Sequence, residues 1–596
     1  MYILGISCFY HDAAAALMKD GQLVAAAEEE RFTRVKHDFD FPENAIAFCL
    51  GYAVISARDL DYIVFYEKPF HKFERILMTT LQTFPRSWNV FREAMITWLS
   101  DKLWVKNTIA NKLGVEQSKI LFGDHHLSHA ASAFYPSPFE EAAILTADGV
   151  GEWATTTIGV GRGTSIELLR EIRFPHSLGL LYSAFTAFLG FQVNEGEYKV
   201  MGMAPYGKPE YVDLILDNLL QVADDGSFRV NMDYFSYHYS DRRMFNHRFE
   251  DLLGKPRPPE MPFFTSKTRF PTYYGDKPSD YDGLCRSNEH YADIAGSIQR
   301  VTEEVLVRLA NSLHRETKLK RLCIAGGVGL NSVANGRILR ETPFEELFVQ
   351  PAAGDGGGAL GAALYAYHAV LGKPRNFVLE HAYWGEGYSD GEVKKFLDDN
   401  GVRYDYFPDS DKLVDRVVDD LVRGKVVGWF QGRFEWGPRA LGNRSILADP
   451  RSEEMKDLVN TKIKFREPFR PFAPVVTEED AAGFFEDCDS AIKQMPARYM
   501  LLVLPLNKDR ADSIKAVNHL GTGRLQTMRE EWNPRYYRVI KGFGDATGVP
   551  VLLNTSFNLR GEPIVASPAN AFNTFSKSGL DVLVMENFMI RKQDRS

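Results

Sequence analysis

AAILTADGVGEWATTTIGVGRG, residues 142–163, joins two apolar runs through a turn that is rich in glycine and aspartate. Two short apolar runs around such a turn predict a buried strand, a tight turn and a returning strand. The N-terminus repeats this organisation, because residues 2–7 predict a buried strand and the turn at 19–22 separates two further apolar runs. A strand, turn and strand at the head of each half predict a duplicated α/β core, and two unrelated hairpins are the alternative.

The remaining sequence predicts two domains. A long amphipathic helix is expected over about 289–317, and a strand and a glycine-rich turn follow it in 323–336. The composition changes after a linker around 371–381, so the predicted domains are 1–372 and 380–596. Residues 225–285 are rich in aromatic residues and proline, which predicts either an insertion over a site or a plain surface loop.

Composition narrows the class of protein. Of the 596 residues, 45% are hydrophobic and 25% are charged, which excludes collagen, coiled-coil rods and disordered chains. The net charge of −9 argues against a nucleic-acid partner, since such proteins usually carry a basic stripe. No C-x-x-C motif, secretory signal or membrane-spanning pattern is found, so we expect a cytoplasmic protein without membrane contact. We expect all five cysteines to be reduced: Cys8, Cys49, Cys285, Cys323 and Cys488.

GDHHLSHA, residues 123–130, is the strongest signal in the first predicted domain. Asp124 predicts a helix N-cap, and His125 and His129 then share one helix face, about 5–6 Å apart. Two imidazoles at this spacing suit one metal ion, with Asp148 and Asp355 of two glycine-rich turns as the remaining ligands. This mixed set suits iron(II), zinc or manganese. A capped helix with partly buried histidines is the alternative.

Two glycine-rich turns, in 323–336 and at 354–358, each lie between a predicted strand and a predicted helix. Backbone N–H groups in such turns, together with a helix N-terminus, suit a phosphate or an adenine ring. We therefore predict nucleotide contacts at Gly326, Gly327 and Asn331. Tight packing of the chain at these glycines is the alternative.

Cationic side chains gather in loops of the second predicted domain that are bounded by glycine and proline: Arg433, Arg439, Arg444, Lys464, Arg466, Arg470 and Arg524. Guanidinium groups match phosphate in a bidentate way, so the cluster predicts a pocket for a multiply charged anion. Asn554 and Ser556 are expected to add neutral donors. Solvated surface charges are the alternative, which we expect for Arg451, Lys456 and Arg466.

A series of motifs resembles the NodU/CmcH family of O-carbamoyltransferases, whose members include nodulation-factor, cephamycin, tobramycin and geldanamycin carbamoyltransferases. These motifs run in order over essentially the whole chain: ILGISCFYHDAAAAL, AAAEEERFTRVKHD, DHHLSHAASAFYPSPF, ILTADGVGEWATTT, CIAGGVGLNSVANG, AAGDGGGALGAAL, GPRALGNRSILADPR, FREPFRPFAPVV and LLNTSFNLRGEPIV. The resemblance implies an N-terminal Kae1-like domain with the duplicated fold of actin-like ATPases (ASKHA), and a C-terminal α/β YrdC-like domain.

The resemblance also implies the reaction. Carbamoyl phosphate and ATP, with Mg(II), would form carbamoyl-adenylate in the second domain, and the first domain would transfer the carbamoyl group to a hydroxyl of a small-molecule acceptor. Neither the acceptor nor the oligomeric state follows from the sequence.

The family's residue roles carry over by position. The iron(II) ligands would be His125, His129, Asp148 and Asp355, the four already reached from spacing. His11 and Asp12, in the first hairpin loop, would be catalytic, with His11 either a neutral general base or a group that positions the acceptor. The contacts to carbamoyl phosphate and ATP would come from Arg439, Arg444, Lys464, Arg470, Arg524, Asn554 and Ser556.

Two other functions share some of these features. A Kae1/YrdC-type enzyme that makes a threonylcarbamoyl group on tRNA has both domain types, but the acidity of the chain argues against it. In a chaperone-like ATPase switch, the anion pocket of the second domain would have no role.

Overall fold

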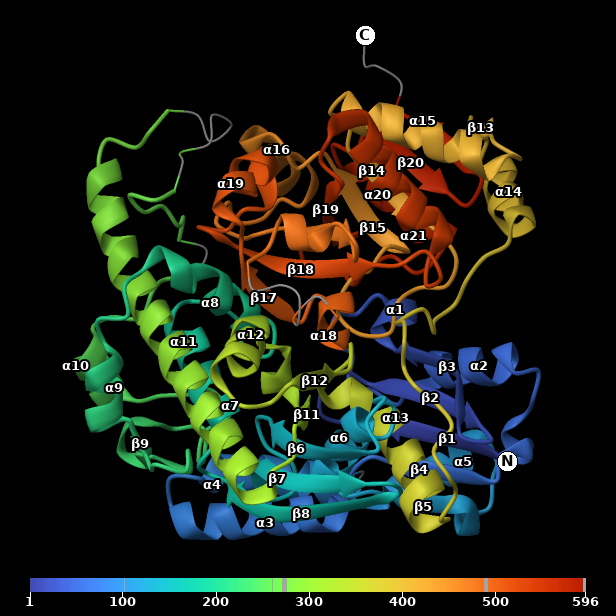
Figure 1. The fold of residues 1–596 in the computed structure, drawn as a ribbon. Coiled ribbons are helices and arrows are strands. Elements are labelled where there is room, and N and C mark those ends of the chain that lie inside the picture. The colour runs from blue at the N-terminus through green and yellow to red at the C-terminus, as the bar shows by residue number, and fades with distance from the viewer. Residues whose placement is uncertain are drawn as a thin grey trace. The chain divides into compact units, whose positions relative to one another are not determined.

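The computed structural model describes residues 1–100, 102–259, 261–268, 270, 276–486, 491 and 493–592. The chain divides into two compact units, whose elements are labelled in Figure 1. Unit 1 comprises Met1–Ala26, Phe39–Thr268 and Asp280–Val378. Unit 2 comprises Ala27–Asp38, Arg269–Ser279 and Leu379–Ser596.

Unit 1 contains two five-stranded mixed sheets. The first has the order β3-β2-β1-β4-β5, and the second has the order β8-β7-β6-β11-β12. In each sheet the leading strand is antiparallel to the next strand in sequence and parallel to the strand on its other side. The first sheet is formed by β1 (Tyr2–Ser7), β2 (Ala14–Lys19), β3 (Gln22–Glu28), β4 (Tyr62–Phe65) and β5 (Ile120–Phe122). The second is formed by β6 (Glu141–Ala147), β7 (Ala154–Arg162), β8 (Ser165–Arg173), β11 (Arg321–Ala325) and β12 (Glu346–Val349). The identical order confirms the predicted duplication of the α/β core.

The turn between β2 and β3 shows why the sequence forms this hairpin. Asp20 and Gly21 have φ angles of 50° and 84°. Positive φ at both central residues is the geometry of a two-residue hairpin, which aspartate tolerates and glycine favours.

Helices cover the sheets of unit 1. Their bounds are α2 (Glu43–Tyr52), α3 (Pro69–Thr83), α4 (Trp88–Ser100), α5 (Val105–Leu113), α6 (His125–Phe134), α7 (Leu178–Phe188), α8 (Glu197–Met203), α9 (Val212–Asn218), α10 (His247–Leu253), α11 (Tyr281–Thr317), α12 (Ser332–Glu341) and α13 (Asp355–Tyr365). The helix predicted over about 289–317 thus begins earlier, at Tyr281. Helix α13 contacts α6, β1 and β2, and a Cβ added at Gly361 would collide with the carbonyl oxygen of Ser128 in α6. The small residues of α13 therefore permit the close approach that brings its N-terminus to α6.

The region 225–285 is partly folded onto unit 1. It contains β10 (Phe228–Val230), which pairs with β9 (Leu220–Val222), together with α10 and the start of α11. Phe245 and Phe249 contact Phe185 and Phe188 of α7 ring to ring, and Phe235 contacts Phe249. Residues 260, 269 and 271–275 of this region lie outside the described part of the chain.

Unit 2 is built on a nine-stranded mixed sheet with the order β13-β21-β20-β14-β15-β19-β16-β18-β17. Its strands are β13 (Asp405–Tyr406), β14 (Val427–Phe430), β15 (Arg444–Ala448), β16 (Ala473–Thr477), β17 (Leu502–Pro505), β18 (Thr522–Met528), β19 (Val551–Ser556), β20 (Val582–Met585) and β21 (Phe588–Arg591). Its helices are α1 (Glu30–Thr33), α14 (Asp390–Asp399), α15 (Ser410–Val422), α16 (Glu453–Leu458), α18 (Met495–Arg498), α19 (Lys508–Ala511), α20 (Pro534–Thr547) and α21 (Pro568–Lys577).

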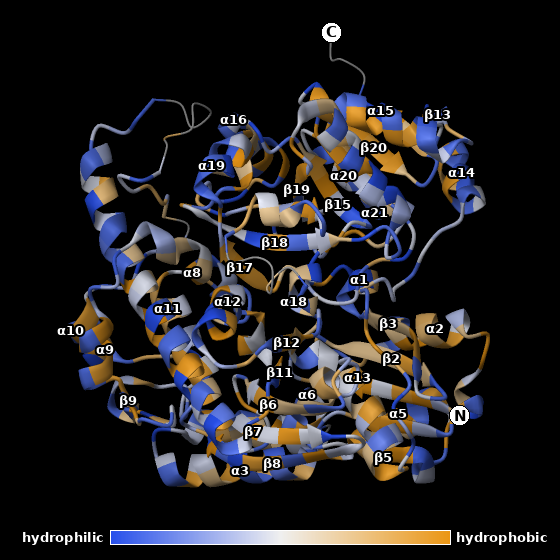
Figure 2. Ribbon diagram, in the orientation of Figure 1, coloured by the Kyte–Doolittle hydropathy of each residue, from blue (hydrophilic) through white to orange (hydrophobic). Residues whose placement is uncertain are grey.

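The core of unit 2 lies between this sheet and α15 and α20. Val417 and Leu421 of α15 and Phe543 of α20 are buried against Trp429 and Leu552 of the sheet. Figure 2 shows hydrophobic and hydrophilic residues along α15, as expected for a helix with one face in the core. The mixed α/β class predicted for the chain is therefore confirmed in both units.

Two further expectations concern the whole chain. Within the described residues, every helix falls short of the length and apolar content that a bilayer crossing requires. Cys8, Cys49, Cys285 and Cys323 are buried and form no disulfide among the described residues. Cys488 lies outside the described residues.

Candidate active site

Helix α6 begins where the sequence predicts, but a different carboxylate caps it. The side chain of Asp124 makes no capping hydrogen bond. Instead the N–H of His125 donates to both carboxylate oxygens of Glu152, at 3.1 and 3.2 Å, and the N–H of Lys68 donates to the same carboxylate at 2.8 Å. Asp124 thus occupies the predicted N-cap position, but Glu152 accepts the helix N–H, because the tertiary fold places the β6–β7 turn against the helix N-terminus.

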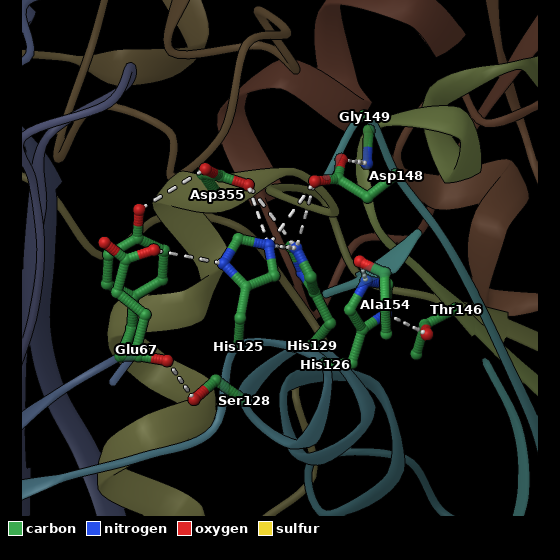
Figure 3. Close-up of polar contacts among 12 residues, drawn as sticks. Glu67, His125, His126, Ser128, His129, Thr146, Asp148, Gly149, Ala154 and Asp355 are labelled. Carbon is green, nitrogen blue, oxygen red and sulfur yellow. Dashed lines mark hydrogen bonds and ion pairs between the residues drawn. The ribbon is translucent and has the colours of Figure 1, made fainter. Parts of the chain in front are cut away.

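Four buried side chains converge in unit 1 (Figure 3). His125 and His129 come from α6, Asp148 follows β6, and Asp355 is the first residue of α13; none is more than 4% exposed. The Nε2 atoms of the two histidines lie 3.1 Å apart. Nε2 of His125 lies 3.4 Å from Asp148 Oδ2, and Nε2 of His129 lies 3.4 Å from Asp355 Oδ1. The four residues predicted as a metal set therefore form one cluster, with one ligand atom of each within 4.8 Å of the others.

The geometry and charge of this cluster fit a divalent first-row ion. Four ligands at about 2.0–2.2 Å from one ion in a tetrahedron lie roughly 3.3–3.6 Å from one another, close to the distances found. Oδ1 of Asp355 is buried and makes no hydrogen bond among the described residues. Burial lowers the pKa of His125, but the carboxylates of Asp355 and Asp148 outweigh it and hold that pKa well above its usual value. This excess of negative potential favours a cation.

Neighbouring groups hold the four side chains in place. The N–H of Gly327 donates to Asp148 Oδ1 at 2.7 Å. Gly326, which has φ of 91°, could not be another residue, because a Cβ there would collide with the carbonyl of Ala147. The glycine-rich turn predicted to bind a nucleotide thus orients an aspartate of the cluster. Asn331 caps α12 by accepting the N–H of Ala334, at 3.1 Å.

Glu67 was missed by sequence reasoning. Its Oε2 lies 3.6 Å from Nδ1 of His125, and Nζ of Lys72 donates to the same oxygen at 2.7 Å. Burial raises the pKa of Glu67, but Lys72 and His125 outweigh it and lower the pKa to about 2, so the carboxylate is ionised. A carboxylate at the end of a predicted buried strand is the signal that could have found it, since Asp148 stands in the same relation to β6.

His126 does not belong to the cluster. Its Nε2 lies 2.9 Å from the carbonyl of Ala154, so this nitrogen carries the proton, and its Nδ1 accepts from the hydroxyl of Thr146 at 2.6 Å. Burial, with His125 and His129 nearby, lowers the pKa of His126 to about 3. A neutral, fully bonded imidazole explains why this histidine is a poor ligand, as its position on the helix predicts.

His11 and Asp12 lie beside the cluster. Nδ1 of His11 is 2.9 Å from Asp12 Oδ2, and its Nε2 is 3.7 Å from Asp355 Oδ2. Burial opposes protonation, but Asp355 and the hydrogen bond to Asp12 raise the pKa of His11 to about 10. These carboxylates favour the protonated form of His11, whereas a general base requires the neutral form. The cause is a neighbouring carboxylate from α13 that sequence spacing cannot show.

In unit 2, Lys464 forms the centre of a polar group. Its Nζ donates to the carbonyl of Ser556 at 2.7 Å and to that of Asn558 at 2.9 Å. Burial, together with the charges of Arg466 and Arg470, holds the pKa of Lys464 well below its usual value. The predicted residues Lys464, Arg470 and Ser556 are therefore neighbours.

Asn554 links other predicted residues across the sheet. Its Nδ2 donates to Gln526 Oε1 at 2.6 Å, two residues from Arg524 on β18. The same amide donates to the carbonyl of Ala440, the residue after Arg439, at 3.2 Å. These contacts bring the loop after Arg439 and the strand that carries Arg524 to the same amide of β19.

Arg444 does not fit the predicted role. Its guanidinium is fully buried and donates to the carbonyls of Gln431, Asn443, Glu386 and Gly432 at 2.7–3.2 Å, over the ring of Phe430. These hydrogen bonds stabilise the loop that carries Arg439, so Arg444 has a structural role in the loop and does not face a ligand. Motif density alone could not separate these two roles.

Arg466 also differs from its prediction as a solvated charge. Its Nε donates to Asn460 Oδ1 at 2.7 Å, and its guanidinium lies over the ring of Phe472. Arg433 is similarly engaged, since its Nε donates to the carbonyl of Gly385 at 2.7 Å. Arg451, in contrast, forms a partly exposed ion pair with Asp449.

A segment that precedes the rest of unit 2 by several hundred residues holds the loop that contains Gly437. Residues 27–38, predicted as part of the first domain, belong to unit 2. The N–H of Gly437 donates to Glu28 and its carbonyl accepts from Arg31, both at 2.6 Å. Arg34 donates to the carbonyls of Pro563 and Ile564 at 2.6 Å. A dense run of charges directly after a buried strand is the sequence signal for this segment.

The whole chain can now be compared with known proteins. Residues 2–364 match the family model described as Carbamoyltransferase N-terminus, and residues 418–592 match the one described as Carbamoyltransferase C-terminus. The chain belongs to the carbamoyltransferase family. The resemblance read from the motifs is confirmed, and the protein is a carbamoyltransferase enzyme.

Relatives of this carbamoyltransferase extend over all or part of its length. An uncharacterised protein of Synechocystis is 48% identical over 99% of this chain and 97% of its own. Nodulation protein NolNO of Sinorhizobium fredii is 38% identical over 99% of this chain and 80% of its own. A 3'-hydroxymethylcephem-O-carbamoyltransferase of Amycolatopsis lactamdurans is 37% identical over 41% of this chain and 44% of its own.

Proposed function

We propose that this carbamoyltransferase forms carbamoyl-adenylate from carbamoyl phosphate and ATP in unit 2, with release of phosphate and pyrophosphate. Unit 1 would then transfer the carbamoyl group to a hydroxyl of a small-molecule acceptor, with release of AMP. Unit 1 would then be a Kae1-like domain of the actin-like ATPase type, and unit 2 a YrdC-like domain. The observation that carries this proposal is the separation of two opposite kinds of site. A buried cluster of histidines and carboxylates lies in unit 1, and a set of cationic side chains lies in unit 2.

The cationic set of unit 2 suits the first half-reaction. Carbamoyl phosphate and ATP are both multiply charged anions, and guanidinium and ammonium groups match their phosphate oxygens. Arg439, Lys464, Arg470 and Arg524 would supply these charges, with Asn554 and Ser556 as neutral neighbours. Adenylation gives the carbamoyl carbon a good leaving group, which a free carbamate lacks.

The cluster of unit 1 suits the second half-reaction. Iron(II) or another first-row divalent ion would be held by His125, His129, Asp148 and Asp355, and when bound it would polarise the carbonyl and neutralise the departing phosphate. Mg(II) would accompany ATP. His11, hydrogen-bonded to Asp12, would hold the acceptor hydroxyl beside the carbamoyl group. A bound cation would offset the charge of Asp355, which returns the pKa of His11 toward the range of a general base.

Transfer to oxygen is supported by the relatives. The cephem enzyme that this chain resembles over part of its length is named as an O-carbamoyltransferase. A hydroxyl is therefore the acceptor group that we propose for this chain.

The first half-reaction provides the test. The full-length protein should release pyrophosphate from ATP when carbamoyl phosphate is present and no acceptor is added. Pyrophosphate release that is independent of carbamoyl phosphate would contradict the proposal. The second half-reaction is tested by mass spectrometry of a panel of hydroxylated metabolites, where one product should gain a single carbamoyl group.

A further inference from the structure

Arg75, on α3 of unit 1, differs from the other buried arginines. The described residues include five arginines that are at least nine-tenths buried: Arg31, Arg75, Arg257, Arg337 and Arg444. Four of them donate hydrogen bonds to carbonyls or carboxylates, as illustrated by Arg337 with Glu303 at 2.9 Å and Arg257 with the carbonyl of Leu189 at 3.2 Å. Arg75, only 7% exposed, makes no hydrogen bond or ion pair among the described residues, and its Nε is buried.

An arginine in this state points to a ligand. A guanidinium has five N–H donors, and burying the charge without a partner is destabilising. The contact found for Arg75 is with the ring of Phe174, 4.8 Å from the guanidinium carbon, which stabilises the cation but leaves its N–H groups in the plane available. Buried groups that stay unsatisfied are uncommon in folded proteins and often mark functional sites.

The nearby carboxylates are already committed to other groups. Glu67 accepts from Lys72, one turn before Arg75 on α3, and faces His125. Glu152 accepts the N–H groups of Lys68 and His125. Glu67 and Glu152 therefore act on Arg75 only through space, and the described part of the chain contains no counter-ion bonded to it.

Ring contacts connect α3, which carries Arg75, both to the aromatic region 225–285 and to His11. The ring of Phe174 lies 6.4 Å from that of Tyr237, which belongs to the aromatic region 225–285. Nζ of Lys72 lies 4.5 Å from the ring of Tyr10, and the ring of Tyr10 lies 4.8 Å from that of His11 in a tilted arrangement. The glycine-rich turn lies elsewhere in the cluster, at Asp148, where Gly327 donates its N–H.

We propose that Arg75 binds an oxyanion carried by the carbamoyl acceptor, so that the acceptor is a hydroxylated compound with a carboxylate or phosphate group. The assignment of the oxyanion to the acceptor rests on the proposed function, whereas the oxyanion site itself does not. A phosphate of the nucleotide has the same chemistry, and the experiment below separates the two sources.

The probe is inorganic sulfate, which is titrated into the full-length protein and followed by calorimetry. Chloride keeps the ionic strength constant during the titration. The wild-type protein should contain a sulfate site that Arg75→Gln weakens at least tenfold, because a charge-assisted bond is lost. Arg75→Lys should restore part of the affinity. Arg86→Gln, which removes an exposed arginine that lies over Tyr239, is the matched control and should bind as the wild type does. Equal sulfate binding by wild type and Arg75→Gln would overturn the proposal.

AMP then identifies the source of the oxyanion. If the site belongs to the acceptor, AMP should leave the affinity of the Arg75-dependent sulfate unchanged. Displacement of that sulfate by AMP would assign the site to the nucleotide and overturn the acceptor assignment. Carbamoyl-phosphate-dependent pyrophosphate release should be the same in wild type and Arg75→Gln. Failure of that release in the wild type would remove the proposed function but not the sulfate result. Its loss only in Arg75→Gln, despite an unchanged circular dichroism spectrum, would show that Arg75 acts on adenylate formation instead.

Discussion

The two units arrange their buried charges in opposite ways. In unit 1, His125, His129, Asp148 and Asp355 direct their ligand atoms at one another, and the carboxylates dominate the local potential. In unit 2, the positive charges of Lys464, Arg466 and Arg470 lie close together, and burial together with this proximity lowers the pKa of Lys464. The first arrangement suits a cation and the second an anion.

The comparison also distinguishes residues that could bind a ligand from residues that stabilise the fold. Arg444 stands in the densest motif of the chain, yet backbone carbonyls surround its guanidinium. Arg75 stands in an unremarkable helix, yet its N–H groups make no hydrogen bond among the described residues. The surroundings of a side chain therefore indicate its role better than the density of the motif that contains it.

Loss of a ligand atom from unit 1 should have the largest effect. His129→Ala removes one of the four ligands, so protein prepared without oxidation should lose most of its metal, expected at about one ion per chain. Carbamoyl transfer should fall by more than about a hundredfold, since changes to groups that merely orient ligands already reach that size. Elemental analysis and the rate of transfer measure these effects.

His126→Ala is the matched control on the same helix. Both nitrogens of His126 are bonded to Thr146 and Ala154, so this variant should keep its metal. Full metal content in folded His129→Ala, or equal loss from both variants, would contradict the assignment of the cluster.

A change at Arg444 should affect stability and not ligand affinity. Arg444→Met leaves four buried carbonyls without their donor, so the free energy of unfolding should fall by about 3–5 kcal/mol. Denaturant titration measures the loss. At a temperature where the variant is folded, the KM for carbamoyl phosphate should stay near the wild-type value. A large rise in KM would instead show that Arg444 contacts the ligand.

Arg470→Ala tests the separation of the two half-reactions. One charge-assisted hydrogen bond, worth about 1.5–3 kcal/mol, corresponds to a roughly ten- to hundredfold loss of adenylate formation. Synthetic carbamoyl-adenylate should restore transfer to near the wild-type rate, because unit 1 is unchanged. Arg451→Ala removes a partly exposed ion pair with Asp449 and a contact with the ring of Phe543, and should form the adenylate as the wild type does. If the adenylate does not restore transfer in folded Arg470→Ala, the assignment of the two half-reactions to separate units is contradicted.

The smallest effect is expected at the start of α6. Glu152→Ala removes the acceptor of the His125 and Lys68 N–H groups and should lower the free energy of unfolding by about 1–2 kcal/mol. Asp124→Ala, at the position that the sequence predicts as the cap, should change it by less than about 0.5 kcal/mol. Thermal unfolding of both variants measures the difference, and a larger loss for Asp124→Ala would reverse the assignment of the cap.

The sequence by itself determined the features that depend on local patterns. The hairpin at Asp20 and Gly21 follows from residues that tolerate positive φ, and the shared face of His125 and His129 follows from helical periodicity. Asp148 and Asp355 could be added because each stands in a glycine-rich turn. Order of motifs along the chain was enough to indicate the family.

Only the tertiary structure decided features that join distant parts of the chain. Glu152 caps α6, Glu67 faces His125, and residues 27–38 hold the Gly437 loop across about four hundred residues of sequence. Arg75 was not singled out by any motif, because what distinguishes it is the lack of a bonded partner among the described residues. The physical reason is that burial, hydrogen bonding and charge are set by neighbours in space, and a local pattern specifies only neighbours within a few turns or one hairpin.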